Sequence, residues 1–135
     1  MSNKAPTVVR DIMSRDCYRV TGNTSVATLV AGLALHRLPG APVVDERDHL
    51  IGFVSEMDVM GKLLDSAYFD DEPAPVRDLM RHEVLTVTPN KSIADLAQEM
   101  LGTKPKVYPV VEGERLVGIV TRRDVVSAIL QMRGH

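Results

Sequence analysis

The sequence predicts an α/β protein built from two repeats, each with the order strand, helix, strand, strand, helix. Three observations lead to this prediction: an internal repeat, apolar runs that alternate between strand and helix periodicity, and a composition typical of soluble globular proteins. The chain has 135 residues, of which 44% are hydrophobic and 25% charged. That length is enough for about one ordinary domain with a shared core.

The two halves of the chain repeat each other. The matching pairs are residues 9–13 and 76–80 (VRDIM and VRDLM), 42–44 and 109–111 (PVV in both), and 50–55 and 116–121 (LIGFVS and LVGIVT). The offset is 67 (76 − 9) for the first two pairs and 66 (116 − 50) for the third. The one-residue difference falls in a polar stretch between two apolar runs, where a hairpin loop tolerates a change of length.

The repeat sets the expected domain organisation. We expect repeat 1 at residues 8–69, a linker at 70–75 and repeat 2 at 76–132. A half of about 60 residues buries little surface alone, so we expect the two sheets to pack face to face, with the helices outside and a pseudo-twofold axis relating the halves.

In the first half, residues 18–21 form a short β-like run, and Ser25 or Thr24 is the expected N-cap of the helix that follows. The apolar positions at helical spacing in this helix are Val26, Leu29, Val30 and Leu33. Pro39 and Gly40 end the helix, and residues 41–45 and 50–55 read as a hairpin. A second helix is expected to carry Val59, Met60, Leu63, Leu64 and Ala67 on one face.

The second half follows the same order, beginning with a strand at residues 84–88. Ser92 and Asp95 predict a capping box at the start of the next helix. The residues expected on its inward face are Ile93, Leu96, Ala97 and Met100. A hairpin at residues 107–112 and 116–121 and a helix to about Met132 complete the repeat.

Each half places a hydroxyl residue and an aspartate where a strand runs into a helix: Ser55 with Asp58, and Thr121 with Asp124. We call these the first corner and the second corner. The first N–H groups of a helix lack intrahelical partners, and its positive dipole end attracts anions. Each corner is therefore a candidate phosphate site, of micromolar to submillimolar affinity once the cost of immobilising a ligand is included.

A structural explanation of the corners competes with this one. A hydroxyl at the N-cap with an acid three residues later is close to a capping box, which stabilises a helix by about 1 kcal/mol without any ligand. Two features favour binding: Asp is shorter than the usual Glu, and Gly52 and Gly118 leave space beside the strand. From the motif alone, capping and binding both stay open.

The two corners differ in charge. Arg122 and Arg123 stand where the first half has Glu56 and Met57. We therefore expect phosphate-bearing ligands to bind more tightly at the second corner.

These features resemble a tandem pair of CBS domains, the regulatory module named after cystathionine β-synthase. The resemblance rests on the repeated VRD-hydrophobic-Met openings, the PVV strands and the paired motifs Gly-hydrophobic-hydrophobic-Ser/Thr-x-x-Asp, and it extends from about residue 8 to 130. It implies a stand-alone module that binds AMP, ADP, ATP or S-adenosylmethionine in the cleft between the repeats. It also implies a homodimer formed through helices, and an unidentified protein that responds to ligand occupancy.

The resemblance also implies the binding residues. In the family, the motif Asp holds the ribose hydroxyls, the Ser or Thr faces phosphate, and strand residues enclose the adenine. The first site would use Val20, Thr21, Ala41, Pro42, Ser55 and Asp58. The second would use Val87, Thr88, Tyr108, Pro109, Thr121 and Asp124, with Arg122 and Arg123 near the phosphate.

Other classes of function find little support. The net charge of −2 does not favour general nucleic-acid binding, and the single cysteine, Cys17, excludes an intrachain disulfide. With no long apolar run and no recognisable metal or nucleophile motif, we expect a cytoplasmic, non-enzymatic protein without membrane segment or catalytic cofactor. Two alternatives stay open: a structural homodimerisation module with vestigial sites, and a small nucleotide-hydrolysing enzyme with a metal-binding carboxylate pair.

Overall fold

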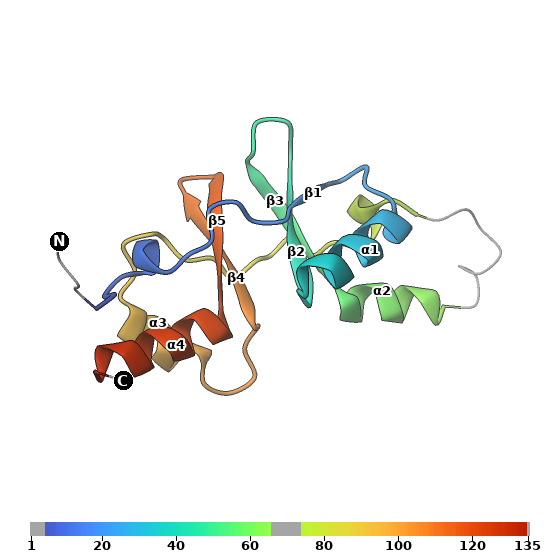
Figure 1. Cartoon of the computed structure of the whole chain (residues 1–135). Coiled ribbons are helices and arrows are strands. Elements are labelled where there is room, and N and C mark those ends of the chain that lie inside the picture. The colour runs from blue at the N-terminus through green and yellow to red at the C-terminus, as the bar shows by residue number, and fades with distance from the viewer. Residues whose placement is uncertain (1–4, 66–73, 135) are drawn as a thin grey trace. The chain divides into compact units, whose positions relative to one another are not determined.

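The structure is a computed structural model, which describes residues 5–65 and 74–134. The first half forms β1 (Val20–Thr21), α1 (Val26–His36), β2 (Gly40–Val44), β3 (Leu50–Ser55) and α2 (Glu56–Leu63). The second half forms α3 (Ile93–Met100), β4 (Val107–Glu112), β5 (Arg115–Thr121) and α4 (Arg122–Met132) (Figure 1). Short 3-10 turns, η1 (Val9–Asp11) and η3 (Val76–Asp78), open the two halves. The predicted α/β class with two repeats is confirmed.

The first sheet has the order β1-β2-β3, with β1 parallel and β3 antiparallel to β2. The second sheet contains only β4 and β5 among the described residues, so the expected strand at 84–88 is wrong. Only Val87 forms a bridge there, to Val110 of β4. Pro89 explains the difference, because it has no N–H with which to extend the ladder. Gly22 stands at the equivalent place in the first half.

The chain divides into two compact units, whose boundaries differ from those of the sequence repeats. One unit, which we call contiguous, is Tyr18–Val84, and the other, which we call composite, joins Met1–Cys17 to Leu85–His135. In the composite unit the N-terminal segment, blue in Figure 1, runs beside β5 and pairs Ser14 with Ile119. In the contiguous unit η3 lies beside the start of α1, where the Val76 N–H donates to the Thr24 carbonyl at 2.8 Å.

Each unit has its own apolar core. In the contiguous unit, Leu29 and Leu33 of α1 pack with valines of β1, β2 and β3. In the composite unit, Ile93 and Leu96 of α3 pack with Val125 of α4 and with the two strands. Val9 and Val76, the first residues of η1 and η3, are fully buried. The repeated VRD-hydrophobic-Met openings therefore supply core residues.

The helices follow the sequence prediction closely, with one correction. Ser25 and Ser92 cap α1 and α3, but Asp95 does not return a bond to Ser92, so the predicted capping box there is only half formed. Of the apolar residues expected on one face of α2, only Val59 is buried. Met60, Leu63 and Leu64 are 54%, 41% and 75% exposed, and Ala67 lies outside the described residues.

Candidate functional site

Both corners form a complete capping box. At the second corner the Asp124 N–H donates to Thr121 Oγ1 at 3.1 Å, and the Thr121 N–H donates to Asp124 Oδ2 at 2.9 Å. At the first corner the matching distances are 3.2 and 2.9 Å, and Ser55 Oγ also donates to Asp58 Oδ2 at 2.8 Å. The cap therefore uses only one oxygen of each carboxylate.

The same bonds satisfy most of the amides at the start of each helix. Besides the two amides in each box, the Glu56 N–H donates to the Pro39 carbonyl at 2.9 Å. The Arg122 N–H donates in the same way to the Lys106 carbonyl at 2.8 Å. Three of the four N–H groups that a helix start leaves unpaired thus have partners within the chain. The expectation of several free amides at each corner is wrong, and at most one remains.

The second carboxylate oxygen distinguishes the corners. At the first corner Asp58 Oδ1 accepts a hydrogen bond from Arg81 Nε at 3.0 Å, and the Asp58 side chain is only 12% exposed. At the second corner no donor among the described residues reaches Asp124 Oδ1. The second corner therefore offers a partly buried carboxylate oxygen with a free hydrogen-bonding position.

Arg81 is a residue of the first corner that the sequence analysis does not identify. It directly follows the VRDLM motif, and its equivalent, 67 residues earlier, is Ser14. Backbone bonds between Arg81 and Phe53, at 2.8 and 3.0 Å, place it beside β3, two residues before Ser55. The repeat itself carried a signal, since a long cation in one half replaces a small hydroxyl residue in the other.

The two strand glycines have a different role from the one expected. A Cβ on Gly52 would lie 2.8 Å from the Arg81 carbonyl, and one on Gly118 would lie 2.7 Å from the Ser14 carbonyl. The space beside each strand is thus filled by another segment of the chain, residues 80–81 at Gly52 and residues 13–14 at Gly118. We call each of these the crossing segment of its unit. It gives no argument for a ligand, contrary to the sequence interpretation.

In the contiguous unit, the structure brings together only some of the predicted site residues. Ser55 pairs with Gly40 at the first position of β2, which places Ala41 and Pro42 at the same end of the sheet. Thr21 pairs instead with Val44, four residues further along β2, or about 13 Å at the rise of a strand. Within this sheet, Val20 and Thr21 therefore lie away from the first corner.

The composite unit repeats this separation. Thr121 pairs with Val107, so Tyr108 and Pro109 follow at the second corner's end of β4. Val87 bridges to Val110 further along the strand, and Thr88 follows it. Burial raises the pKa of the Tyr108 hydroxyl, and the nearby Glu99 raises it further, so this phenol stays neutral.

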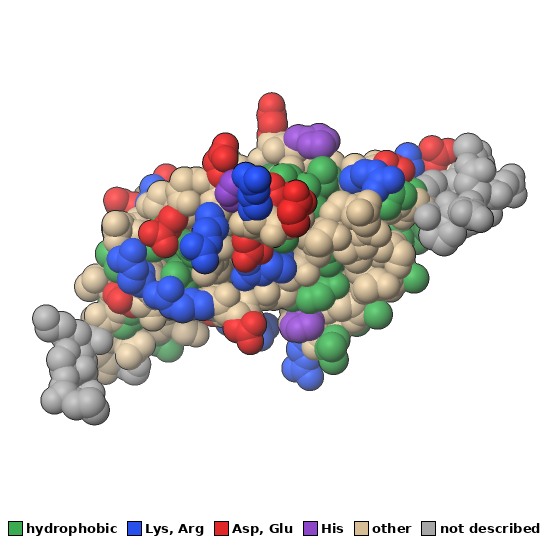
Figure 2. All heavy atoms as spheres, turned by 90° about the horizontal axis from the view of Figure 1, so that it is seen from above, with side chains coloured by type: hydrophobic (Ala, Val, Ile, Leu, Met, Phe, Trp, Pro, Cys, Tyr) green, Lys and Arg blue, Asp and Glu red, His purple; other side chains and the backbone are tan. Residues whose placement is uncertain are grey.

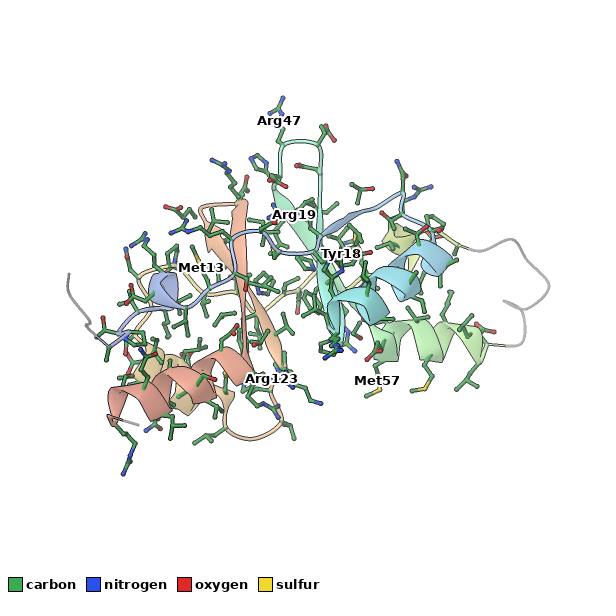
Figure 3. The ribbon with its side chains drawn as sticks, viewed as in Figure 1. Met13, Tyr18, Arg19, Arg47, Met57 and Arg123 are labelled. Carbon is green, nitrogen blue, oxygen red and sulfur yellow. The ribbon has the colours of Figure 1, made fainter. Side chains whose placement is uncertain are left out.

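Arg122 and Arg123 are exposed and form no ion pair with any described residue. Arg123 extends outward from the first turn of α4, as Met57 does from the first turn of α2 (Figure 3). Basic and acidic side chains are interspersed over the face of the molecule shown in Figure 2. At the second corner, the two adjacent arginines place two positive charges at the start of α4.

The family model described as "CBS domain" matches residues 9–65 and 76–131. Among solved structures, CBSX2 in complex with AMP has 32% sequence identity and a TM-score of 0.83, covering 95% of this chain and 99% of that one. CBSX2 is a CBS-pair protein of Arabidopsis thaliana. The CBS domain pair of protein MJ0100, solved with 5-methylthioadenosine and S-adenosyl-L-methionine, has 26% identity and a TM-score of 0.77, covering 94% and 98% of the two chains.

Among curated proteins, the uncharacterized protein MJ1225 of Methanocaldococcus jannaschii is 30% identical over 121 residues. The match covers 90% of this chain but 42% of that protein, so the chain spans less than half the length of this relative. Among the described residues, none of the helices reaches the length and hydrophobicity of a membrane span.

Proposed function

Because the chain belongs to the CBS-domain family, we propose that it is a non-catalytic regulatory module that binds an adenosine-containing ligand at the second corner. The candidate ligands are AMP, ADP, ATP and S-adenosylmethionine. The observation that carries the proposal is the free Oδ1 of Asp124, held beside Thr121 and two exposed arginines.

Each part of such a ligand would have a partner at the second corner. Asp124 Oδ1 accepts hydrogen bonds, and a ribose diol offers two adjacent hydroxyl donors. Arg122 and Arg123 supply charge for a phosphate or carboxylate group, and charge-assisted hydrogen bonds contribute about 1.5–3 kcal/mol each. The start of α4 adds the favourable end of the helix dipole. Tyr108 and Pro109 have buried side chains and lie near the second corner's end of β4, and we propose that this end of the strand lies beside the base.

The relatives support the ligand class. The structure of CBSX2 contains AMP, and that of the MJ0100 pair contains two adenosyl compounds. Their common group is the adenosine moiety, while the phosphate is present in only one of them. We therefore expect recognition of the nucleoside to be primary and recognition of the phosphate to set the preference among ligands.

Calorimetric titration with AMP, ADP, ATP, S-adenosylmethionine and NADH tests the proposal. Asp124→Asn is the informative variant, because its amide oxygen can still accept the Thr121 N–H while the charge is lost. We expect binding to weaken about tenfold or more with little change in stability, since one charge-assisted bond is lost. If none of the five compounds binds or raises the melting temperature, the proposed function is wrong.

We further propose that the module forms a homodimer through α2 and α4. Both helices carry apolar side chains that their own unit leaves exposed, including Met57 and Met60 on α2 and Val126 and Leu130 on α4. This observation also supports the second candidate function, a structural dimerisation module with vestigial sites. Ligand binding by the wild type separates the two candidates.

The regulatory role requires one more element. A ligand shifts a conformational equilibrium only if it binds one arrangement better than another. We propose that occupancy of the second corner is transmitted to a partner protein through such a difference. Hydrogen exchange of the intact chain with and without AMP would detect it, as protection that extends beyond the residues of the corner.

A further inference from the structure

The two corners offer an internal comparison, because the same backbone arrangement carries different side chains. The Ser14 N–H and carbonyl pair with Ile119 at 2.8 and 3.0 Å, and those of Arg81 pair with Phe53 at 2.8 and 3.0 Å. Ser14 and Arg81 are equivalent at the repeat offset of 67, and Ile119 and Phe53 at 66. The backbone of the crossing segment thus contacts both corners in the same way. The corners differ in the side chain at this position, which is serine in one and arginine in the other.

That side chain decides whether the corner's carboxylate is free. Arg81 extends to Asp58 and donates Nε to Oδ1 at 3.0 Å. Ser14 forms no side-chain hydrogen bond with any described residue. At the first corner Ser55 donates a hydrogen bond to one oxygen of Asp58, and Arg81 donates one to the other oxygen. At the second corner one oxygen stays available.

We propose that Arg81 is a specificity-determining residue that occupies the first corner and restricts adenosyl ligands to the second. The inference rests on the proposed function and extends it, because it assigns different ligand occupancy to the two corners. A ribose diol can use Asp58 only by displacing the guanidinium or sharing the carboxylate with it.

The exposure of Arg81 to solvent determines how far it lowers the ligand affinity of the first corner. The Arg81 side chain is 65% exposed, and ion pairs open to solvent on one side are weak. We therefore expect Arg81 to weaken binding at the first corner by about tenfold rather than to abolish it. At moderate ligand concentration the chain would then bind one ligand.

A reciprocal exchange tests the proposal, because each half supplies the residue for the other. Arg81→Ser frees Asp58, and we expect titration with AMP to change from one tight site per chain to two. Ser14→Arg places a guanidinium beside Asp124, and we expect the affinity of the second corner to fall about tenfold. Both positions are exposed, so neither substitution removes core packing.

The double variant Arg81→Ser with Asp58→Asn is the matched control, and we expect it to lose the new site. Adenosine gives a second readout, because it has the diol but no phosphate charge. Salt screens the pair between Arg81 and Asp58, so binding of adenosine at the first corner should strengthen with ionic strength in the wild type but not in Arg81→Ser.

Three results would overturn the inference. If the wild type binds two equivalent ligands per chain, or if Arg81→Ser leaves the stoichiometry at one, Arg81 does not restrict the first corner, although the proposed function stands. If neither the wild type nor Arg81→Ser binds adenosine or any of AMP, ADP, ATP, S-adenosylmethionine and NADH, the proposed function and the inference fail together.

Discussion

The carbonyl oxygen of Ser14 would lie only 2.7 Å from a Cβ built on Gly118. The strand carries glycine there because another segment of backbone crosses it at close range. The same relationship holds between Gly52 and Arg81 at 2.8 Å. Close approach of a backbone is one of the few reasons for a glycine inside a strand.

Gly118→Ala should therefore destabilise the protein by about 1–3 kcal/mol, because a backbone carbonyl has to move to admit the methyl group. Urea denaturation followed by circular dichroism measures the change in the free energy of unfolding. Gly61→Ala is the control: it lies inside α2 with open space around it, and alanine is the better helix former by about 1 kcal/mol. Equal stability of Gly118→Ala and the wild type would contradict the close approach of the Ser14 carbonyl to Gly118.

Thr121→Ala should lower stability by about 1 kcal/mol in the absence of any ligand, because the Asp124 N–H loses its cap. Asp124→Asn should have a much smaller effect on stability, since the amide oxygen still accepts from the Thr121 N–H. Thermal unfolding without ligand measures both. A large loss of stability in Asp124→Asn would mean that binding data for this variant report folding rather than recognition.

Exchanging the charges at the second corner should change the preference among ligands. With Arg122→Glu and Arg123→Met, which are the residues of the first half, affinity for ATP should fall at least tenfold. Affinity for adenosine should change little, because it carries no phosphate. Calorimetry with both ligands gives the comparison. Equal losses for ATP and adenosine would show that the arginines act on the corner's structure and not on phosphate.

Acid should destabilise the composite unit partly through Asp11. Backbone N–H groups of Thr7 and Val8 donate to its Oδ2, at 3.0 and 3.2 Å, and hold the pKa of this carboxyl below its usual 3.8. Because the folded pKa is the lower one, the stabilisation is full above the unfolded pKa and is lost as the pH falls through the folded pKa.

We therefore expect Asp11→Asn to lose stability less steeply than the wild type as the pH falls below about 4, in a series of melting temperatures. Asp16→Asn is the matched control, because it removes the same charge from an exposed side chain that has no hydrogen bond to a described residue. Parallel acid profiles for the two variants would exclude a special contribution from Asp11.

Lysine at the exposed apolar positions of α2 and α4 should weaken self-association. Met60 and Leu130 are 54% and 53% exposed, and a charge at either would be costly to bury in an interface. Sedimentation velocity of Met60→Lys and Leu130→Lys should show more monomer than the wild type. Leu35→Lys on α1, at a position 79% exposed, is the control and should leave the dimer unchanged. A monomeric wild type at micromolar concentration would refute the dimer.

Most of the fold could be predicted from local patterns in the sequence. The two hairpins and the helix starts at Ser25, Ser55 and Thr121 follow from short-range periodicity and capping chemistry. The strand expected at 84–88 is reduced to a single bridge at Val87. Its apolar pattern is that of a strand, but Pro89 directly after it has no N–H to donate to the ladder. Helical periodicity also places Val59, Met60 and Leu63 on one face of α2, but it does not show what covers that face.

The candidate site depended on contacts between residues distant in the sequence, and these were harder to predict. Asp58 and Arg81 are 23 residues apart, and only the crossing segment brings them together. The repeat shows that Ser14 and Arg81 correspond, but not that either reaches a corner. Local reasoning therefore found both capping boxes and missed the residue that makes them unequal.

The division of the chain into units affects the order in which it can fold. The contiguous unit closes with contacts inside Tyr18–Val84, whereas the composite unit must join Val9 to the Lys91 carbonyl across most of the chain. Contacts distant in sequence have a larger loop-closure cost and slow folding. During synthesis on the ribosome, the contiguous unit can fold while the N-terminal segment still lacks its partner strand, so docking of that segment onto β5 would be the last step of folding.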